Sequence, residues 1–127
     1  MAWEDPGQIV PLKAGATIAA NTLVYMTADQ TVSKTSGPTN CAMGVAKQAA
    51  ASGTAVPVQV NGVSKILVGT AAGITFGSPL MAQANGAVAL WVTAAGANFI
   101  IGYAWEASTI DGQYISVLLA TPATARA

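Results

Sequence analysis

The sequence predicts an all-β protein, a small β-barrel or sandwich with an internal duplication and an extended N-terminal arm. Three observations predict this class: short apolar runs that alternate with period two, turn-forming dipeptides between the runs, and a segment that recurs once with its flanking order preserved. The chain has 127 residues, which suffices for one domain with a hydrophobic core.

The alternating runs and the turns locate the strands. Residues 56–60 alternate between Val and other residues, and Asn61-Gly62 follows, a strong hairpin signal because a type I′ turn needs positive φ at both central residues. We therefore expect 63–68 to form the returning strand. Pro57 cannot donate a backbone hydrogen bond, which favours an edge or a bulge for its strand. Two further strands and two further turns are expected at 98–105, 114–119, Asn85-Gly86 and Asp111-Gly112.

The chain contains a weak internal duplication. Residues 40–49 align with 98–107, so that one Asn, one Gly and two Ala recur at a fixed spacing, and an alternating strand follows each copy. Chance matching is the alternative, because Ala and Gly are common in this chain. We interpret the match as two copies of a β unit that pair their open edges. Gly44 and Gly102 would then lie in mid-strand, at a bulge or a close backbone approach.

The domain boundaries follow from these features. We expect a flexible arm over 1–11, a β domain over 12–120 and a flexible tail over 121–127. The two β units span about 14–68 and 71–120. The arm carries two adjacent acids and two prolines, and the tail consists of Ala, Thr and Pro with one Arg, so both are expected to be flexible in isolation.

The surface composition favours contact with other proteins. Charged residues make up 8% of the chain and hydrophobic residues 53%, and the formal net charge is zero. An average soluble domain is about 25% charged. A surface covered mainly by small and uncharged polar residues repels a partner only weakly. An Ala-rich, sparingly soluble monomer is the alternative interpretation.

The same composition argues against several kinds of partner. The five basic residues are scattered singly, so the chain lacks the clustered basic face that nucleic acid requires. No run approaches the ~20 apolar residues of a membrane-spanning helix. The N-terminus lacks the basic and apolar regions of a signal peptide. We expect neither a nucleic-acid partner nor a membrane partner.

Residues that carry chemistry are scarce. The chain has no His, the commonest general base and metal ligand, and only one Cys, Cys41. No glycine-rich phosphate loop is present. We therefore predict no enzyme activity, no metal and no cofactor. Glu106, beside Trp105 and Tyr103, is the one acid expected to be partly buried, and it keeps open the alternative of an enzyme or a small-ligand-binding barrel.

Four aromatic residues are candidates for contact with a partner. Tyr103 and Trp105 lie two positions apart and share one face of the expected strand, where they anchor either the core or a subunit interface. Trp91 is a third candidate for that interface. Trp3 lies in the polar arm with no local core to join, and we expect it to dock on a partner when the arm orders.

The order of these segments resembles a known family. An arm precedes Gly-Ala-Thr-Ile and Leu-Val-Tyr, then Cys-Ala-Met-Gly-Val-Ala, a small-residue loop and Gly-Thr-Ala-Val-Pro-Val-Gln-Val-Asn-Gly-Val. A second, similar round ends in Tyr-Ile-Ser-Val-Leu-Leu. Over about Ile9 to Leu119 this pattern, with its low charge, resembles the capsid decoration (cement) proteins of tailed bacteriophages, the broad group that includes the lambda head-decoration protein.

The resemblance implies a β-tulip fold and a homotrimer on the capsid exterior, made in the host cytoplasm. Its partner would be the major capsid protein, and the trimer would sit at local three-fold points and stabilise the shell. The resemblance assigns capsid binding to the arm, through Trp3, Glu4, Asp5, Ile9 and Val10. Another self-assembling virion component, such as a head-fibre base or a tail part, is the alternative.

Overall fold

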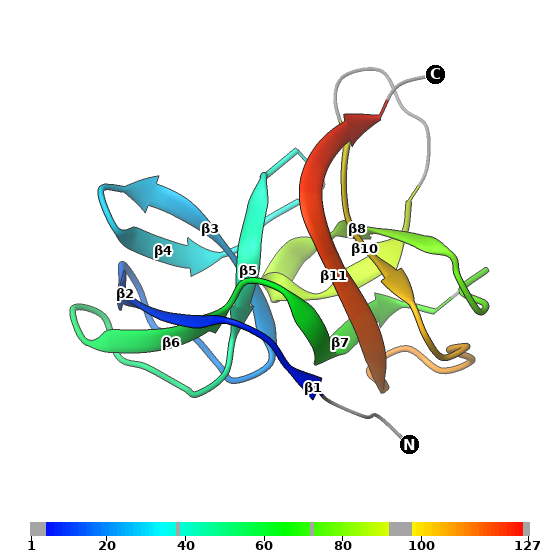
Figure 1. The fold of residues 1–127 in the computed structure, drawn as a ribbon, viewed down its shortest axis with the longest axis horizontal. Coiled ribbons are helices and arrows are strands. Elements are labelled where there is room, and N and C mark those ends of the chain that lie inside the picture. Colours follow the sequence, from blue (N-terminus) through cyan, green and yellow to red (C-terminus); the bar gives the residue numbers. More distant parts are fainter. Residues whose placement is uncertain (1–4, 38, 72, 92–97, 126–127) are drawn as a thin grey trace.

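The fold consists of two small β-barrels that lie side by side along the long axis of the molecule (Figure 1). The computed structural model describes residues 5–37, 39–71, 73–91 and 98–125. Within these ranges the chain forms strands joined by turns and loops, with one three-residue 3-10 turn and no α-helix. The prediction of an all-β barrel protein is confirmed.

The first barrel has five strands and closes on itself. Around the barrel their order is β2-β4-β3-β5-β6, and β6 pairs with β2 to complete the ring. The β2–β4 pair is parallel and the other pairs are antiparallel. The strands are β2 (Ile9–Ala14), β3 (Thr22–Ala28), β4 (Thr31–Lys34), β5 (Ala42–Ala46) and β6 (Ala55–Gln59).

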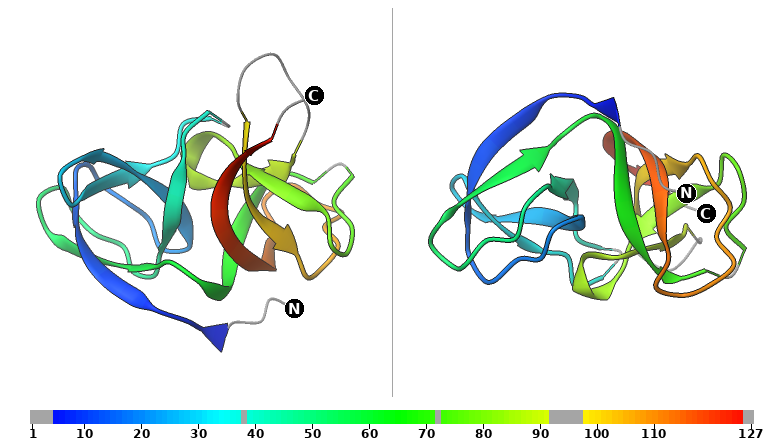
Figure 2. Two further views of the ribbon diagram at one scale, coloured as in Figure 1. Left: turned by 45° about the horizontal axis from the view of Figure 1, so that its top comes forward. Right: turned by 90° about the horizontal axis from the view of Figure 1, so that it is seen from below.

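The second barrel repeats this topology. Its strands are β7 (Gly62–Thr70), β8 (Pro79–Ala82), β9 (Val88–Leu90), β10 (Asn98–Ala104) and β11 (Tyr114–Ala125), with the 3-10 turn η1 (Ala84–Gly86) between β8 and β9. Their order is β7-β9-β8-β10-β11, and β7–β9 is again the parallel pair. A short strand, β1 (Asp5–Pro6), adds to the edge of β7. Figure 2 shows both barrels from two further sides.

The two barrels also agree residue by residue. Val24 pairs with Gly44 in the first barrel, as Leu80 pairs with Gly102 in the second. The turns agree as well: the positive-φ residues at three matching turns are Asn21 and Gly77, Gln30 and Gly86, and Gly53 and Gly112. The internal duplication is therefore confirmed in strand order and in register. Val45 pairs with Leu23 and Gln59, and Tyr103 pairs with Pro79 and Leu118. Val45 and Tyr103 are therefore equivalent in the same way.

The two mid-strand glycines mark close approaches of neighbouring strands. A Cβ at Gly44 would lie 2.4 Å from the carbonyl oxygen of Gln59, and a Cβ at Gly102 would lie 2.5 Å from that of Leu118. Each glycine also adjoins a register shift in its ladder. Both predicted roles, bulge and close backbone approach, are present at both positions.

Two apolar clusters form the core. The cluster of the first barrel comprises Ala14, Ile18, Val24, Val32, Ala46, Val56 and Val58. The second barrel encloses a larger cluster that includes Ile66, Leu80, Ile115 and Val117. Leu23, Ala42 and Val45 of the first barrel also belong to this larger cluster. The second barrel therefore covers part of the first, and the two barrels share a core.

The hairpin predicted at Asn61-Gly62 is wrong. β6 pairs with β2 and β5, whereas β7 pairs with β1, β9 and β11. Asn61-Gly62 instead links the barrels, with Gly62 at φ 85°. Gly62–Thr70 consequently belongs to the second barrel, although the expected units placed 63–68 in the first. The dipeptide reports a local turn, but it does not decide which strands pair.

The ends of the β domain differ from the expected boundaries. Residues 9–11, expected in the arm, lie in β2, because β6 supplies them with a partner strand. Residues 121–125, expected in the tail, lie in β11, where the ladder to β10 extends to Ala125. The register between β10 and β11 shifts between Ile100 and Gly102, which accommodates Pro122 within the strand.

Pro57 lies in neither an edge strand nor a bulge. β6 has partners on both sides, and Pro57 is directly opposite Pro11 of β2. Hydrogen-bonded and non-hydrogen-bonded residue pairs alternate along an antiparallel ladder. The hydrogen bonds from Ala14 N to Thr54 O and from Val60 N to Gln8 O show which pairs of this ladder are the hydrogen-bonded ones. That alternation makes the Pro11–Pro57 pair a non-hydrogen-bonded one. The two missing donors therefore cost the β2–β6 ladder no hydrogen bond.

Candidate functional site

The expected arm residues divide between three places. Trp3 and Glu4 lie outside the described residues. Asp5 lies in β1 and pairs with Val63 of β7. Ile9 and Val10 lie in the wall of the first barrel, with Ile9 45% exposed and Val10 half-buried. The structure therefore joins β1 to the second barrel and residues 9–11 to the first.

Exposed aromatic and aliphatic side chains gather on the outer face of β10 and β11. Tyr103 and Trp105 are 40% and 47% exposed. Across the ladder, Leu118 is directly opposite Tyr103, and the N–H of Trp105 donates to Ser116 O at 2.9 Å. We call Tyr103, Trp105, Tyr114 and Leu118 the aromatic face.

Half of the aromatic face was predicted. The period-two spacing of Tyr103 and Trp105 placed them on one side of a strand. Tyr114 and Leu118 of β11 are 43% and 37% exposed, and the sequence pattern does not predict that they belong to this face. Leu118 joins it through its pairing with Tyr103, which depends on the β10–β11 register. Trp91 is half-buried just beyond β9, and its backbone N–H donates to Pro79 O at 2.9 Å.

Glu106 has a structural role in this face. Its Oε1 accepts a hydrogen bond of 2.8 Å from the backbone N–H of Ser116. Partial burial works to raise the pKa of Glu106, but opposing interactions, led by hydrogen bonds from the Ser116 N–H and hydroxyl, hold that pKa below its ordinary value. The carboxylate is therefore ionised at neutral pH and ties the end of β10 to β11. A general acid would need the opposite shift.

Asp111 also supports the fold. Its Oδ1 accepts a hydrogen bond of 2.8 Å from the backbone N–H of Ala71, which joins the loop before β11 to the end of β7. Among the described residues, no group of three or more His, Cys, Asp or Glu side chains is placed to hold a metal ion. The part of the chain that the structure describes also contains no helix long and apolar enough to cross a bilayer.

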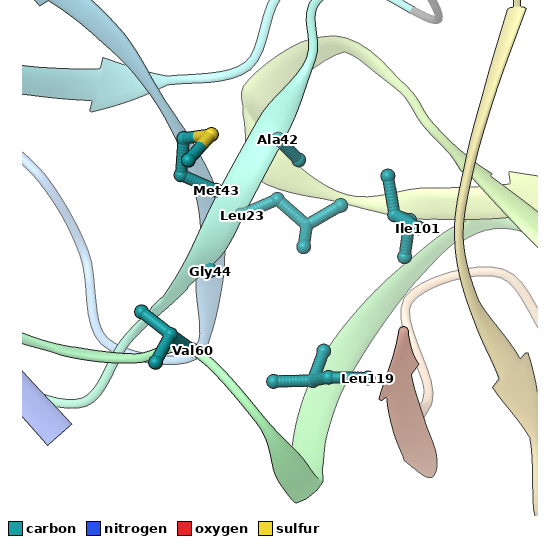
Figure 3. Close-up of a pocket in the computed structure, with 7 residues that line it drawn as sticks. All are labelled: Leu23, Ala42, Met43, Gly44, Val60, Ile101 and Leu119. Carbon is teal, nitrogen blue, oxygen red and sulfur yellow. The ribbon is translucent and has the colours of Figure 1, made fainter. Parts of the chain in front are cut away.

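The described residues line a small cavity and an open surface groove. The barrels meet around an apolar cavity of about 10 Å³, across which Leu23, Ile101 and Leu119 point toward one another (Figure 3). Ligand pockets usually measure about 300–1,000 Å³, so this cavity holds at most one water-sized molecule. A surface groove of about 280 Å³ lies on the first barrel and is lined by Pro11, Leu12, Lys13, Gln30, Gly53 and Ala55.

Comparison with known proteins assigns the family. The model of the phage cement protein family matches residues 5–119, which covers nearly all of both barrels. The chain belongs to the phage cement protein family. It is therefore a structural protein of the phage virion and a component of the capsid.

A solved structure has the same fold as this cement protein. The head fiber gp8.5 N base of bacteriophage phi29 aligns with a TM-score of 0.64 and 19% sequence identity, over 90% of this chain and 94% of that chain. At this level of identity the likeness concerns the fold alone. A search of curated proteins finds no match. The resemblance inferred from the sequence is confirmed at the level of the family.

Proposed function

We propose that this cement protein binds the outside of the phage capsid as a homotrimer and stabilises the shell without catalysing a reaction. Membership of the cement family over residues 5–119 carries the proposal. The aromatic face supports it, because exposed Tyr and Trp side chains commonly anchor protein interfaces. The role assigned to Glu106, a hydrogen-bonded structural carboxylate, argues against the enzyme alternative.

The major capsid protein is the proposed partner, and the arm is the proposed contact. β1 pairs with β7 on one side, and among the described residues no strand pairs with its other side. An open edge of this kind accepts an added strand. Trp3, Glu4 and Asp5 would make that contact, together with the exposed Ile9 of β2.

Binding to shells tests the proposal. Purified protein is mixed with expanded, empty shells of its phage and sedimented, and shell disruption on heating is followed with and without the protein. We expect saturable co-sedimentation and a higher disruption temperature for decorated shells. Absence of co-sedimentation would refute capsid binding, and an unchanged disruption temperature would refute stabilisation.

A shortened chain tests the arm separately. Deletion of residues 1–4 removes Trp3 and Glu4 but leaves β1 and β2 in the chain, so the barrels keep all their strands. We expect weaker binding to shells with an unchanged thermal unfolding temperature. Full binding by the shortened chain would refute the role of Trp3 and Glu4 and leave the rest of the proposal standing.

A head-fibre base is the second candidate, because the solved structure with the same fold is described as the base of a head fiber. The two functions differ in solution. A protein that stays soluble as a small oligomer until it meets a shell supports the cement role, whereas spontaneous fibres or tubes support the alternative. Negative-stain electron microscopy of the purified protein distinguishes them.

A further inference from the structure

Three residues of the first barrel contact the second barrel, two through hydrogen bonds and one through apolar packing. The Thr35 hydroxyl donates to Gln83 O at 3.0 Å. Val45 packs in the larger core cluster, which the second barrel encloses. Lys47 Nζ donates to Ser64 Oγ at 3.0 Å. Together they define the face by which the first barrel packs on the second.

The duplicated topology identifies the corresponding face of the second barrel. Thr35 and Trp91 are equivalent because each backbone N–H donates to a carbonyl at the start of β3 or β8. Lys47 and Trp105 are equivalent because each follows β5 or β10 and its N–H donates to β6 or β11. The pairing of Val45 and Tyr103 follows from the strand registers. The residues that correspond to the three contact residues are therefore Trp91, Tyr103 and Trp105.

The other side of the internal contact is the turn between β8 and β9. The N–H of Gly86 donates to Thr35 O at 3.1 Å, and a Cβ at Gly86 would lie 2.5 Å from Thr22 Cβ. The equivalent turn of the first barrel lies between β3 and β4. Gln30 has the place of Gly86 there, with φ of 52° against 70°. Asp29 and Gln30 are both exposed, so among the described residues the second barrel does not cover this turn.

The two exposed surfaces belong to different barrels. The turn between β3 and β4 lies at one end of the long axis, and the aromatic face belongs to the barrel at the other end (Figure 1). Within one copy the two surfaces do not contact each other, but the aromatic face of one copy can contact the β3–β4 turn of the next. The contact would use a different patch on each partner, which is a heterologous, head-to-tail arrangement.

We infer that a second copy of this chain is the occupant of the aromatic face. The second barrel of one copy packs against the β3–β4 turn of the next copy at Gln30, through Tyr103 and Trp105 of the aromatic face and through Trp91, which, like Tyr103, adjoins Pro79. The contact repeats between molecules the one that joins the barrels within each molecule. It continues an interface that this structure already contains.

The side chains at the two contacts differ in a compensating way. Gly86 has no side chain and permits a close approach to Thr22, whereas Gln30 carries a side chain at the equivalent position. The contact between copies must therefore be wider. The larger rings of Trp91, Tyr103 and Trp105, in place of Thr, Val and Lys, suit a wider gap, and no charged side chain of the first barrel other than Asp29 lies in the β3–β4 turn.

This inference deepens the proposed homotrimer by naming its contact. A heterologous contact closes into a ring or continues as an open helix, depending on the rotation between copies. In a ring of three copies, internal and intermolecular barrel contacts would alternate around six barrels. The contact itself does not depend on capsid binding, so its failure and the failure of shell binding are separate results.

Self-association of the full chain tests the inference. The mass of the wild-type protein is measured by analytical ultracentrifugation over a range of concentrations. Tyr103→Glu places a charge on the aromatic face, and Gln30→Glu places one on the turn with almost no change in volume. We expect each variant to weaken association at least about thirtyfold, the loss typical of an interface hot spot. Ile110→Glu is the matched control, because Ile110 is 66% exposed in the loop before β11 and is not among the residues of either surface.

Mixing the two variants tests the head-to-tail geometry. Tyr103→Glu retains an intact turn, and Gln30→Glu retains an intact aromatic face. Equal amounts of the two should therefore form a one-to-one dimer that goes no further, although each variant alone is monomeric. Gln30→Gly, which copies Gly86, should weaken association of the otherwise unchanged chain, because it removes a side chain that the wider contact accommodates. Circular dichroism checks folding of every variant, and Tyr103→Ser replaces Tyr103→Glu if the latter unfolds.

Several outcomes would overturn the inference. A wild-type chain that stays monomeric at high concentration would do so. So would Tyr103 variants that associate like Ile110→Glu, or a mixture of the two acidic variants that remains monomeric. Shell binding by a chain that stays monomeric would overturn this contact and preserve capsid binding, which distinguishes the two failures.

Discussion

Replacement of the two mid-strand glycines by alanine tests the packing of both barrels. A Cβ at Gly44 would lie 2.4 Å from Gln59 O and 2.7 Å from Val58 Cγ1. A Cβ at Gly102 would lie 2.5 Å from Leu118 O and 2.8 Å from Val117 Cγ1. In each case the nearest atom belongs to the backbone, so no side-chain rotation relieves the overlap.

The magnitude follows from these distances. Ordinary contact begins at 3.4 Å, so each methyl group must push the neighbouring strand away by about 1 Å, which stretches the hydrogen bonds of the ladder. Overpacking of this kind costs about 1–3 kcal/mol of unfolding free energy. For a chain of this size we expect Tm to fall by about 3–15 °C for each variant. The sites lie in different barrels, so the double variant should show nearly additive losses.

Urea unfolding followed by tryptophan fluorescence and circular dichroism gives the free energies. Gly37→Ala is the control, because no atom lies within 4 Å of its added Cβ and its φ is not positive. We expect the control to stay within about 0.5 kcal/mol of the wild type. If Gly44→Ala and Gly102→Ala unfold at the same urea concentration as the control, the close approach of the strands is wrong.

Four further variants test the shared core and two carboxylates. Leu23→Ala should cost about 2–5 kcal/mol, because Leu23 is 1% exposed in the shared cluster, and calorimetry should show one transition rather than two. Because the folded-state pKa of Glu106 is lowered, its ionisation stabilises the fold above pH 4.5 and this stability is lost as pH falls through the lower folded pKa. The Tm advantage of wild type over Glu106→Gln should therefore shrink below about pH 4.5, and a constant difference down to pH 3 would contradict the assignment. Asp111→Ala should cost about 1 kcal/mol through loss of the bond to Ala71 N, whereas Asp111→Asn, which keeps an acceptor, should cost less by the same urea assay.

The positions of the strands were largely predictable from the sequence, but their partners were not. Period-two alternation located 56–60 and 114–119, because each strand of a barrel has one face in the core. The hairpin predicted at Asn61-Gly62 was wrong, because a turn dipeptide is a local signal and strand pairing depends on long-range contacts. The recurrence of the segment around Gly44 and Gly102 was the better guide to topology, since it reflected the repeated unit as a whole.

The candidate surface was predictable only in part for a similar reason. The spacing of Tyr103 and Trp105 placed them on one face, but Leu118 joins them only through the strand register. Ile9 was expected in the arm because residues 1–11 carry two adjacent acids and two prolines. In the structure Pro11 lies opposite another proline, and the strand continues through it.

The short link Asn61-Gly62 has a consequence for when this protein assembles. It holds the two barrels of one chain at a high effective concentration, so their contact persists however dilute the protein is. A contact between separate copies has no such tether, and it forms only when copies accumulate. A shell that gathers many copies on its surface would supply that accumulation, so the same kind of interface would be permanent within a chain and conditional between chains.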